Sequence, residues 1–231
     1  MLDWILKKSI SKQELARLAI MSIYETTLRQ KGKIIIAGVD EVGRGPLAGP
    51  VVAAACILEE GFVLEGINDS KKLAPEKRAE IFEKLVALNV HFKIGIVSEK
   101  RIDSINILNA THEAMLLAIN SLEIKPDFLL IDGNQLPYTS IPSQGIIEGD
   151  SKSISIAAAS IIAKVKRDAI MIEYDKLWPE YHFADNKGYG TKDHLDALQK
   201  HGPCDIHRRS FDPIKSMLSL DLFSSFKTDC W

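Results

Sequence analysis

The hydrophobic residues of the chain form two kinds of pattern, short continuous runs and longer stretches with helical spacing. The continuous runs predict strands at 33–37, 51–58, 90–97, 128–131 and 146–147. Helical spacing predicts helices at 11–30, 75–88, 104–121, from 151 onward and at 192–200. Strands that alternate with helices in this way indicate the α/β class, with a mixed central sheet flanked by helices.

Local signals at the helix starts support these elements. Ser11 is followed three residues later by Glu14, which is the spacing of a capping box. Pro75 falls in the first turn of its helix, where proline is well tolerated. The helix from 151 carries one apolar stripe, and its small residues at 157–160 allow close approach to a neighbouring element.

The composition is that of an ordinary globular protein. Of the 231 residues, 46% are hydrophobic and 26% are charged, which argues against a disordered, collagen-like or coiled-coil chain and for one domain with an appendage. The net charge of -2 attracts no polyanion by itself, so nucleic-acid binding would need a local basic face. Three cysteines without a CxxC pair argue against disulfides or zinc and favour a reducing cytoplasm. No apolar run reaches the length of about 18 residues that would predict a transmembrane helix.

Acidic residues follow several of the predicted strands. Asp40-Glu41, Asp132 and Asp150 each close an apolar run, and in an open α/β sheet the strand ends line the site crevice. Each residue alone is explained by a turn or a helix cap, and Asp150 could simply cap the helix that follows it. Gathered together, such carboxylates would repel one another unless a cation neutralised them. Oxygen donors without His or Cys favour Mg²⁺ or Mn²⁺, and two such ions could activate water at a phosphodiester.

Two glycine-containing segments are candidates for substrate contact. Glycines in the loop 43–50 expose the backbone, and Arg44 between them can meet a phosphate. A tight strand connection would explain this loop equally, and it matches neither phosphate-loop nor dinucleotide fingerprints. In 186–191, Tyr189 lies between two glycines and can present its ring to a sugar or base, although a packed loop aromatic is the alternative. Some of the nearby basic residues are expected to follow a phosphate backbone: Lys71, Lys72, Lys152, Lys164, Lys166, Arg167, Lys187, Lys192, Arg208 and Arg209.

With these segments in order, the sequence resembles ribonuclease HII, the type 2 ribonucleases H. The resemblance rests on 36–52 (IAGVDEVGRGPLAGPVV), 69–73 (DSKKL), 131–133 (IDG), 149–152 (GDSK), 157–164 (AAASIIAK), 167–168 (RD), 187–191 (KGYGT) and 207–211 (HRRSF). It covers about residues 33–214, and the first of these segments is long and highly specific.

The resemblance implies a ribonuclease H-like fold with a helical C-terminal part, and a metal-dependent endonuclease. Such an enzyme hydrolyses RNA in RNA–DNA hybrids and incises on the 5′ side of single ribonucleotides embedded in duplex DNA, leaving 3′-hydroxyl and 5′-phosphate ends. By position, the catalytic and metal-binding acids would be Asp40, Glu41, Asp132 and Asp150, with two divalent ions. The residues that would bind substrate are Gly43, Arg44 and Gly45, which match the loop that contacts the ribose 2′-hydroxyl, together with Tyr189, Lys71 and Lys187.

The same resemblance suggests how the chain is divided. We expect an N-terminal helical appendage at 1–32, a ribonuclease H-like catalytic domain at 33–200 and a C-terminal helical extension and tail at 201–231. The short segment before the first strand and the aspartate at 150 favour ribonuclease HII over the related ribonuclease HIII. Asn186 departs from the histidine that the family often has there, and we expect little effect.

The tail offers one further hypothesis. Residues 219–223 resemble the short peptide by which bacterial proteins dock on the replication sliding clamp. A packed or frayed terminal helix explains the same residues, and we prefer that interpretation. We expect a monomer. The rival functions are a noncatalytic binder of RNA–DNA hybrids on the same fold and another two-metal nuclease or strand-transfer protein.

Overall fold

The computed structural model describes the backbone of residues 10–225 and the side chains of residues 10–219. Its centre is a five-stranded sheet with the strand order β3-β2-β1-β4-β5. The strands are β1 (Ile36–Val42), β2 (Val51–Ile57), β3 (His91–Val97), β4 (Phe128–Asp132) and β5 (Ser143–Ile146). Strand β1 is antiparallel to β2 and parallel to β4, which is in turn parallel to β5. The mixed sheet predicted from the sequence is therefore confirmed.

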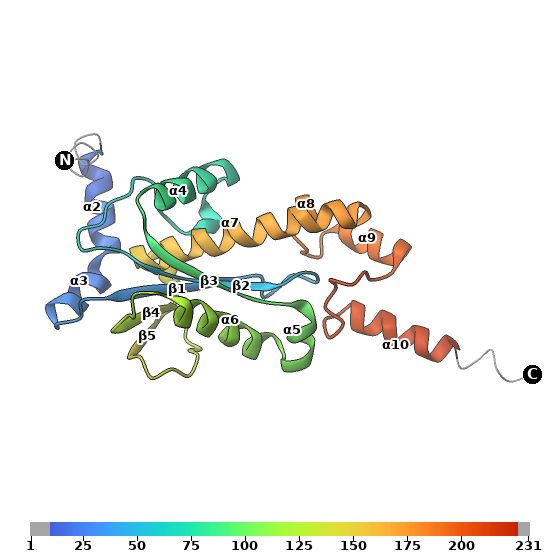
Figure 1. The fold of residues 1–231 in the computed structure, drawn as a ribbon. Coiled ribbons are helices and arrows are strands. Elements are labelled where there is room, and N and C mark those ends of the chain that lie inside the picture. Colours follow the sequence, from blue (N-terminus) through green and yellow to red (C-terminus); the bar gives the residue numbers. More distant parts are fainter. Residues whose placement is uncertain (1–9, 226–231) are drawn as a thin grey trace, which may run out of the picture. The chain divides into compact units, whose positions relative to one another are not determined.

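Helices follow the strands along the chain (Figure 1). They are α2 (Lys12–Met21), α3 (Ile23–Gln30), α4 (Pro75–Ala87), α5 (Glu99–Ile105), α6 (Ile107–Ser121), α7 (Ile154–Leu177), α8 (Phe183–Asn186), α9 (Lys192–His201) and α10 (Ile214–Ser225). Short 3-10 turns occupy Ser70–Lys72, Gly149–Ser151 and Pro179–Tyr181.

Two of the predicted helices are divided in the structure. The helix expected over 11–30 is interrupted at Ser22, whose hydroxyl donates to the Leu18 carbonyl oxygen. Its start is as predicted, because the Ser11 hydroxyl accepts from the Glu14 N–H. The helix expected over 104–121 is divided at Asn106, which has a positive φ of 67°. Asparagine tolerates that conformation, and periodicity alone does not reveal such a break.

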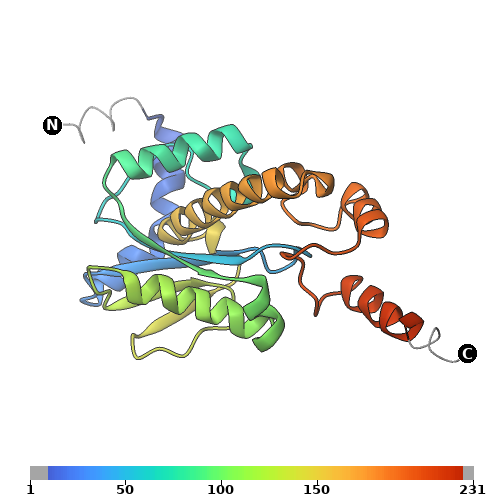
Figure 2. The same cartoon turned by 45° about the vertical axis from the view of Figure 1, so that its right-hand side comes forward.

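The chain forms two compact units. The first comprises the residues up to 42, 52–95 and 112–165, and the second comprises 43–51, 96–111 and the residues from 166 onward. In the first unit, α4 and the beginning of α7 cover one face of the sheet, and α6 covers the other (Figures 1 and 2).

The core of the first unit explains why the beginning of α7 is rich in small residues. Buried side chains from α2, β2, α4 and α7 form one cluster, which includes Leu18, Ala54, Ile81 and Ala158. A methyl group on Gly38 of β1 would overlap the backbone of Ser155 and Ile156. The first turn of α7 therefore lies directly against the strand that carries Asp40.

The second unit has its own aromatic core. Tyr181 and Phe183 stack with ring centroids 5.3 Å apart, and Met171, Leu198 and Ile206 belong to the same buried cluster. This cluster supports the segments on either side of Gly188. None of the helices in the described part of the chain is long and apolar enough to cross a lipid bilayer.

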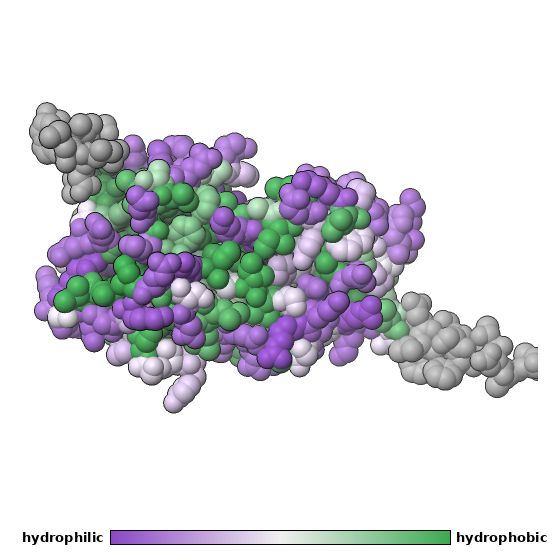
Figure 3. Space-filling model, viewed as in Figure 1, coloured by the Kyte–Doolittle hydropathy of each residue, from purple (hydrophilic) through white to green (hydrophobic). Residues whose placement is uncertain are grey.

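The surface of the first unit carries an apolar groove beside its N-terminal helices. In Figure 3, hydrophobic residues reach the surface beside α2 and α4 within a mainly hydrophilic rim. The groove beside α2 and α3 is lined by Leu15, Ala19, Ile23, Phe62 and Val63.

Candidate active site

The sheet brings three of the predicted acids to one end of its strands. Asp40 and Glu41 lie near the carboxyl end of β1, and Asp132 is the last residue of the parallel strand β4. Val39 pairs with Ile131 in the register of these strands, so the next residues, Asp40 and Asp132, lie at the same level. Parallel neighbours therefore place both carboxylates at the same end of the sheet.

Asp150 reaches this edge through a turn that is tied to β4. The Gly149 N–H donates to Asp132 Oδ1 over 2.6 Å. Asp150 follows in the 3-10 turn Gly149–Ser151, before α7 begins at Ile154. The helix predicted from 151 thus starts three residues later, and the intervening turn carries the acid.

Burial and repulsion from neighbouring acids raise the pKa of Asp40. Asp40 is only 4% exposed, and its pKa is well above the ordinary value because of burial first and then the charges of Glu41, Asp132 and Asp150. The Ser160 hydroxyl of α7 opposes this rise. The four predicted acids are therefore close enough to affect one another electrostatically, as a shared site would require.

A fifth acid, which the sequence analysis did not select, stands beside Asp150. Burial raises the pKa of Asp150 to about 6, and the next largest contributions come from Asp69 and Asp132. Asp69 belongs to the 69–73 segment on which the family resemblance rests, and this was the signal that could have identified it.

Lys71 belongs to the 3-10 turn that Asp69 caps, and its side chain extends toward Asp150. Its ammonium lies 3.8 Å from Asp150 Oδ2, and its side chain is 79% exposed. Partial burial alone would lower the pKa of Lys71, but attraction to Asp150, Asp40 and Asp69 raises it. The amine is therefore charged and accessible, which suits a contact with a substrate phosphate.

The donor set fits a hard divalent cation. All the donors are carboxylate oxygens, which Mg²⁺ and Mn²⁺ prefer, and their mutual repulsion is what a cation would relieve. Among the side chains that the structure describes, no three of Asp, Glu, His or Cys are arranged to hold an ion as they stand.

In the second unit, two buried arginines shape the glycine loop. Arg208 donates to the carbonyl oxygens of Gly43, Arg44 and Gly49, at distances of 2.5, 2.9 and 3.0 Å. Arg167 donates to the carbonyl oxygens of Pro50, Lys187 and Ala48. Both arginines are completely buried. Neither therefore belongs to the basic residues that can follow a phosphate backbone, and both support the loop from inside the protein.

Tyr189 adjoins this loop and is held by its backbone. Its side chain is 43% exposed, and a methyl group on Gly45 would lie 3.7 Å from the Tyr189 ring. His194 Nδ1 lies 2.9 Å from the Tyr189 carbonyl oxygen, and His194 Nε2 lies 2.9 Å from His207 Nε2. Two neutral imidazoles satisfy both contacts. The His207 Nε2–H then donates to His194 Nε2, and the His194 Nδ1–H donates to the Tyr189 carbonyl oxygen.

The residues near Gly188 make hydrogen bonds with the backbone of their own loop. Asn186 accepts from the Gly188 N–H over 2.7 Å and donates to the Tyr181 carbonyl oxygen over 2.7 Å, so the amide fixes the turn before Tyr189. Lys187 has a positive φ of 52°, and its ammonium donates to the Ala184 carbonyl oxygen. This lysine is thus turned toward its own loop, and its substrate contact stays a prediction.

The predicted site residues thus form two groups. The first unit gathers Asp40, Glu41, Asp132, Asp150 and Lys71, and the second gathers Gly43, Arg44, Gly45, Tyr189 and Lys187. The backbone of 219–223 lies within α10. The side chains from Leu220 onward, on which the sliding-clamp hypothesis depends, lie outside the described residues.

Comparisons with known proteins agree on one family. A family model described as Ribonuclease HII matches residues 37–214. Ribonuclease HII of Chlamydia pneumoniae is 52% identical over 211 residues, which cover 91% of this chain and 98% of that protein. Ribonuclease HII of Bacillus thuringiensis (strain Al Hakam) is 52% identical over 217 residues, with coverages of 94% and 84%. The crystal structure of ribonuclease H2 from Pyrococcus horikoshii OT3 matches with a TM-score of 0.68 at 27% identity, over 81% of this chain and 98% of that chain.

Proposed function

We propose that this chain, which belongs to the ribonuclease HII family and is therefore an endoribonuclease H that hydrolyses RNA in RNA–DNA hybrids, also incises duplex DNA at single embedded ribonucleotides. The cut would fall on the 5′ side of the ribonucleotide and leave 3′-hydroxyl and 5′-phosphate ends. We place this activity in a reducing cytoplasm and in a monomer, which accords with the free thiol of Cys56 in β2.

The acidic edge of the first unit would carry the chemistry. Two Mg²⁺ or Mn²⁺ ions, when bound, would activate water and stabilise the leaving oxygen of the phosphodiester. Asp40, Glu41, Asp132 and Asp150 would hold them. The main support is that Asp40 is buried and has its pKa raised by the other three acids. A fold retains such mutual repulsion at a cost in stability, and cation binding is the function that uses it.

Hydrogen bonds around the acids would keep them oriented between turnovers. The Gly149 N–H donates to Asp132 Oδ1, and the Glu41 N–H donates to Asp40 Oδ1 over 2.7 Å. The Lys71 ammonium would attract the substrate phosphate toward the acids, since its side chain is mostly exposed. Each of these groups belongs to the first unit.

Ribose recognition would be performed by the second unit. The buried guanidinium of Arg208 donates hydrogen bonds to the carbonyl oxygens of Gly43 and Arg44. The exposed residues Arg44 and Gly45 would then offer backbone groups to a 2′-hydroxyl, the group that distinguishes RNA from DNA. Tyr189, whose carbonyl is fixed by His194, would stack on the adjacent sugar.

Cleavage of three labelled duplexes tests this proposal: an RNA–DNA hybrid, duplex DNA with one ribonucleotide and duplex DNA without any. The first two should be cut only with Mg²⁺ or Mn²⁺, and the third should stay intact. Ligation and polymerase extension of the products identify the 5′-phosphate and the 3′-hydroxyl. A protein that cuts the hybrid and leaves the single ribonucleotide intact would contradict the proposed incision, and binding without any cleavage would indicate a noncatalytic hybrid binder.

Two substitutions separate the roles of the units. Asp40→Asn should abolish cleavage of both substrates, whereas Asp205→Asn, at an exposed acid, should retain it. Tyr189→Ala should reduce incision at the single ribonucleotide by about tenfold or more, as expected for loss of one stacking contact. Tyr138→Ala is the matched control, because Tyr138 is 98% exposed. Normal activity of Asp40→Asn would refute the role of the acids.

A further inference from the structure

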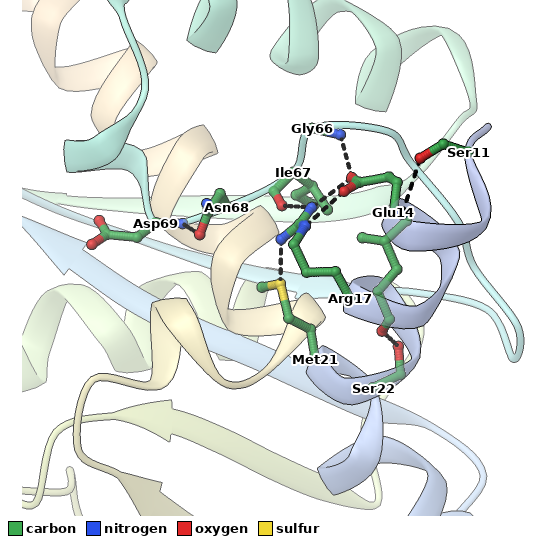
Figure 4. Close-up of polar contacts among 10 residues, drawn as sticks. Ser11, Glu14, Arg17, Met21, Ser22, Gly66, Ile67, Asn68 and Asp69 are labelled. Atoms are coloured by element: carbon green, nitrogen blue, oxygen red, sulfur yellow. Dashed lines mark hydrogen bonds and ion pairs between the residues drawn. The ribbon is translucent and has the colours of Figure 1, made fainter.

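Two side chains of helix α2 form hydrogen bonds with the backbone of the segment that leads to Asp69 (Figure 4). Arg17 Nη2 donates to the Ile67 carbonyl oxygen over 2.8 Å, and Glu14 Oε1 accepts from the Gly66 N–H over 2.9 Å. Arg17 also donates twice to the Glu14 carboxylate, over 2.8 and 2.6 Å. One ion pair on α2 therefore holds two consecutive backbone groups that lie some fifty residues away in sequence.

The pair is built as a rigid unit. The Glu14 and Arg17 side chains are only 18% and 33% exposed, and the hydrogen bond from Arg17 lowers the pKa of Glu14, so the carboxylate stays ionised. Arg17 Nη1 lies 2.9 Å from Met21 Sδ, which orients the remaining edge of the guanidinium. A two-point arginine–carboxylate contact of this kind fixes geometry as well as charge.

The segment that α2 holds continues directly to Asp69 and Lys71, which lie beside Asp150. Asn68 Oδ1 accepts from the Asp69 N–H over 2.9 Å, as Figure 4 also shows, and Asp69 Oδ1 accepts from the Lys71 N–H over 2.8 Å. Asp69 is close enough to Asp150 to raise its pKa, and the Lys71 ammonium lies 3.8 Å from the same acid. The position of two groups beside Asp150 thus depends on where Ile67 and Asn68 are held.

The far side of the segment has a separate anchor. Arg78 of α4 donates to the carbonyl oxygens of Ser70 and Leu73, both over 2.9 Å, and the Ser70 and Ser160 hydroxyls are 2.8 Å apart. Asp69 therefore lies between two fixed points, and only the first of them comes from α2. Loss of that point would release the segment on the side of Asp69 while leaving Ser70 attached.

We propose that Glu14 and Arg17 are positioning residues that hold Asp69 and Lys71 against Asp150. This inference rests on the proposed function of the acidic edge. It extends the machinery to a helix that precedes the residues matched by the family model, which begin at 37. The N-terminal helix is then a functional part of the site as well as a cover for the core.

Arg17→Met tests the proposal, because it keeps an apolar side chain of similar length and removes the hydrogen bonds. Arg29→Met is the matched control. Arg29 also donates to two backbone carbonyls, of Ile34 and Leu58, and neither lies in the segment that carries Asp69 and Lys71. Arg17→Met should speed hydrogen exchange at the Lys71 N–H in the metal-free protein. It should also lower Mn²⁺ affinity, measured by calorimetry without substrate, by about tenfold.

A double-mutant cycle separates positioning from a general loss of stability. If Arg17 acts through Asp69, the effect of Arg17→Met on Mn²⁺ affinity and on kcat should fall below about twofold in an Asp69→Asn background. Effects of equal size in both backgrounds, or an Arg17→Met protein with wild-type exchange, Mn²⁺ affinity and kcat, would overturn the proposal. If Arg17→Met does not fold, Glu14→Gln provides a milder loss of the same contact and must show the same three changes.

The outcomes also distinguish this proposal from the proposed function. A wild-type protein that cleaves no ribonucleotide-containing duplex would refute the function, while exchange and Mn²⁺ binding would still decide whether α2 positions Asp69. A wild-type protein that cleaves, together with an unaffected Arg17→Met variant, would refute the positioning role alone.

Discussion

Replacing Asp150 with asparagine should stabilise the metal-free protein while abolishing cleavage. The wild-type carboxyl group is 7% exposed, and burial, Asp69 and Asp132 raise its pKa to about 6. Ionising this carboxyl group therefore costs more free energy in the folded protein than in the unfolded chain. An asparagine is never ionised, and its amide can donate a hydrogen bond to Asp69.

The magnitude follows from the change in pKa. A rise from 3.8 to about 6 corresponds to about 3 kcal/mol, at about 1.4 kcal/mol for each pH unit. Because the folded state keeps the proton to higher pH than the unfolded state, the wild-type protein loses this stability as pH rises from about 4 to about 6. This shift already includes the opposing attraction of Lys71. Solvent screening at a partly buried site reduces the effect, so the expected net gain at pH 7.5 is about 2 kcal/mol.

Urea unfolding of both proteins at pH 4.5 and pH 7.5 in EDTA measures this difference. The gain of Asp150→Asn should be small at the lower pH and close to its full size at the higher one. Millimolar Mn²⁺ should stabilise the wild type more than the variant, because only the native wild-type site binds the ion tightly. Asp205→Asn, at an exposed acid, should show neither effect. A variant that is less stable than the wild type at pH 7.5 in EDTA would refute the reasoning.

Three further predictions concern the supports of the two units. Arg208→Lys keeps the charge but loses most donations to the 43–50 loop, so urea unfolding should show a loss of about 3 kcal/mol and cleavage assays a drop of at least tenfold. Gly38→Ala should destabilise the protein by about 3 kcal/mol in the same unfolding assay, since the added methyl group overlaps the Ser155 backbone. Burial and His194 lower the pKa of His207 to about 4, so the stability that it contributes is lost as pH falls from about 6.5 to about 4. His207→Gln should flatten that part of the stability profile, and an unchanged profile would contradict the assignment of a neutral imidazole.

The acids at the strand ends could be predicted from sequence because strand geometry determines their position. An apolar run that ends in an acid places that acid at a sheet edge, and parallel pairing of β1 with β4 brings Asp40 level with Asp132. Asp69 could not be predicted in this way. It lies in a turn without periodicity, and its approach to Asp150 depends on tertiary contacts from α2, α4 and α7.

Burial also limits what the sequence predicts. Arginine is a residue type that often binds phosphate. The sequence around Arg167 and Arg208 does not show whether each guanidinium faces solvent or backbone carbonyl oxygens. The second unit buries both, and desolvation lowers the pKa of Arg208 to about 9. The breaks at Ser22 and Asn106 have a similar origin, because a single backbone conformation interrupts a helix without disturbing its apolar spacing.

The two N-terminal helices act on neighbouring parts of the acidic edge. Arg17 of α2 holds the segment that carries Asp69. Glu25 of α3 is buried, and its Oε1 accepts from the hydroxyls of Ser153 and Ser155 over 2.6 and 2.5 Å, just after the turn that carries Asp150. Carboxylates that repel one another would move apart if their segments were free. Because both segments are fixed by side chains of the preceding helices, the first unit can keep Asp69 and Asp150 in contact at a cost that its core must offset.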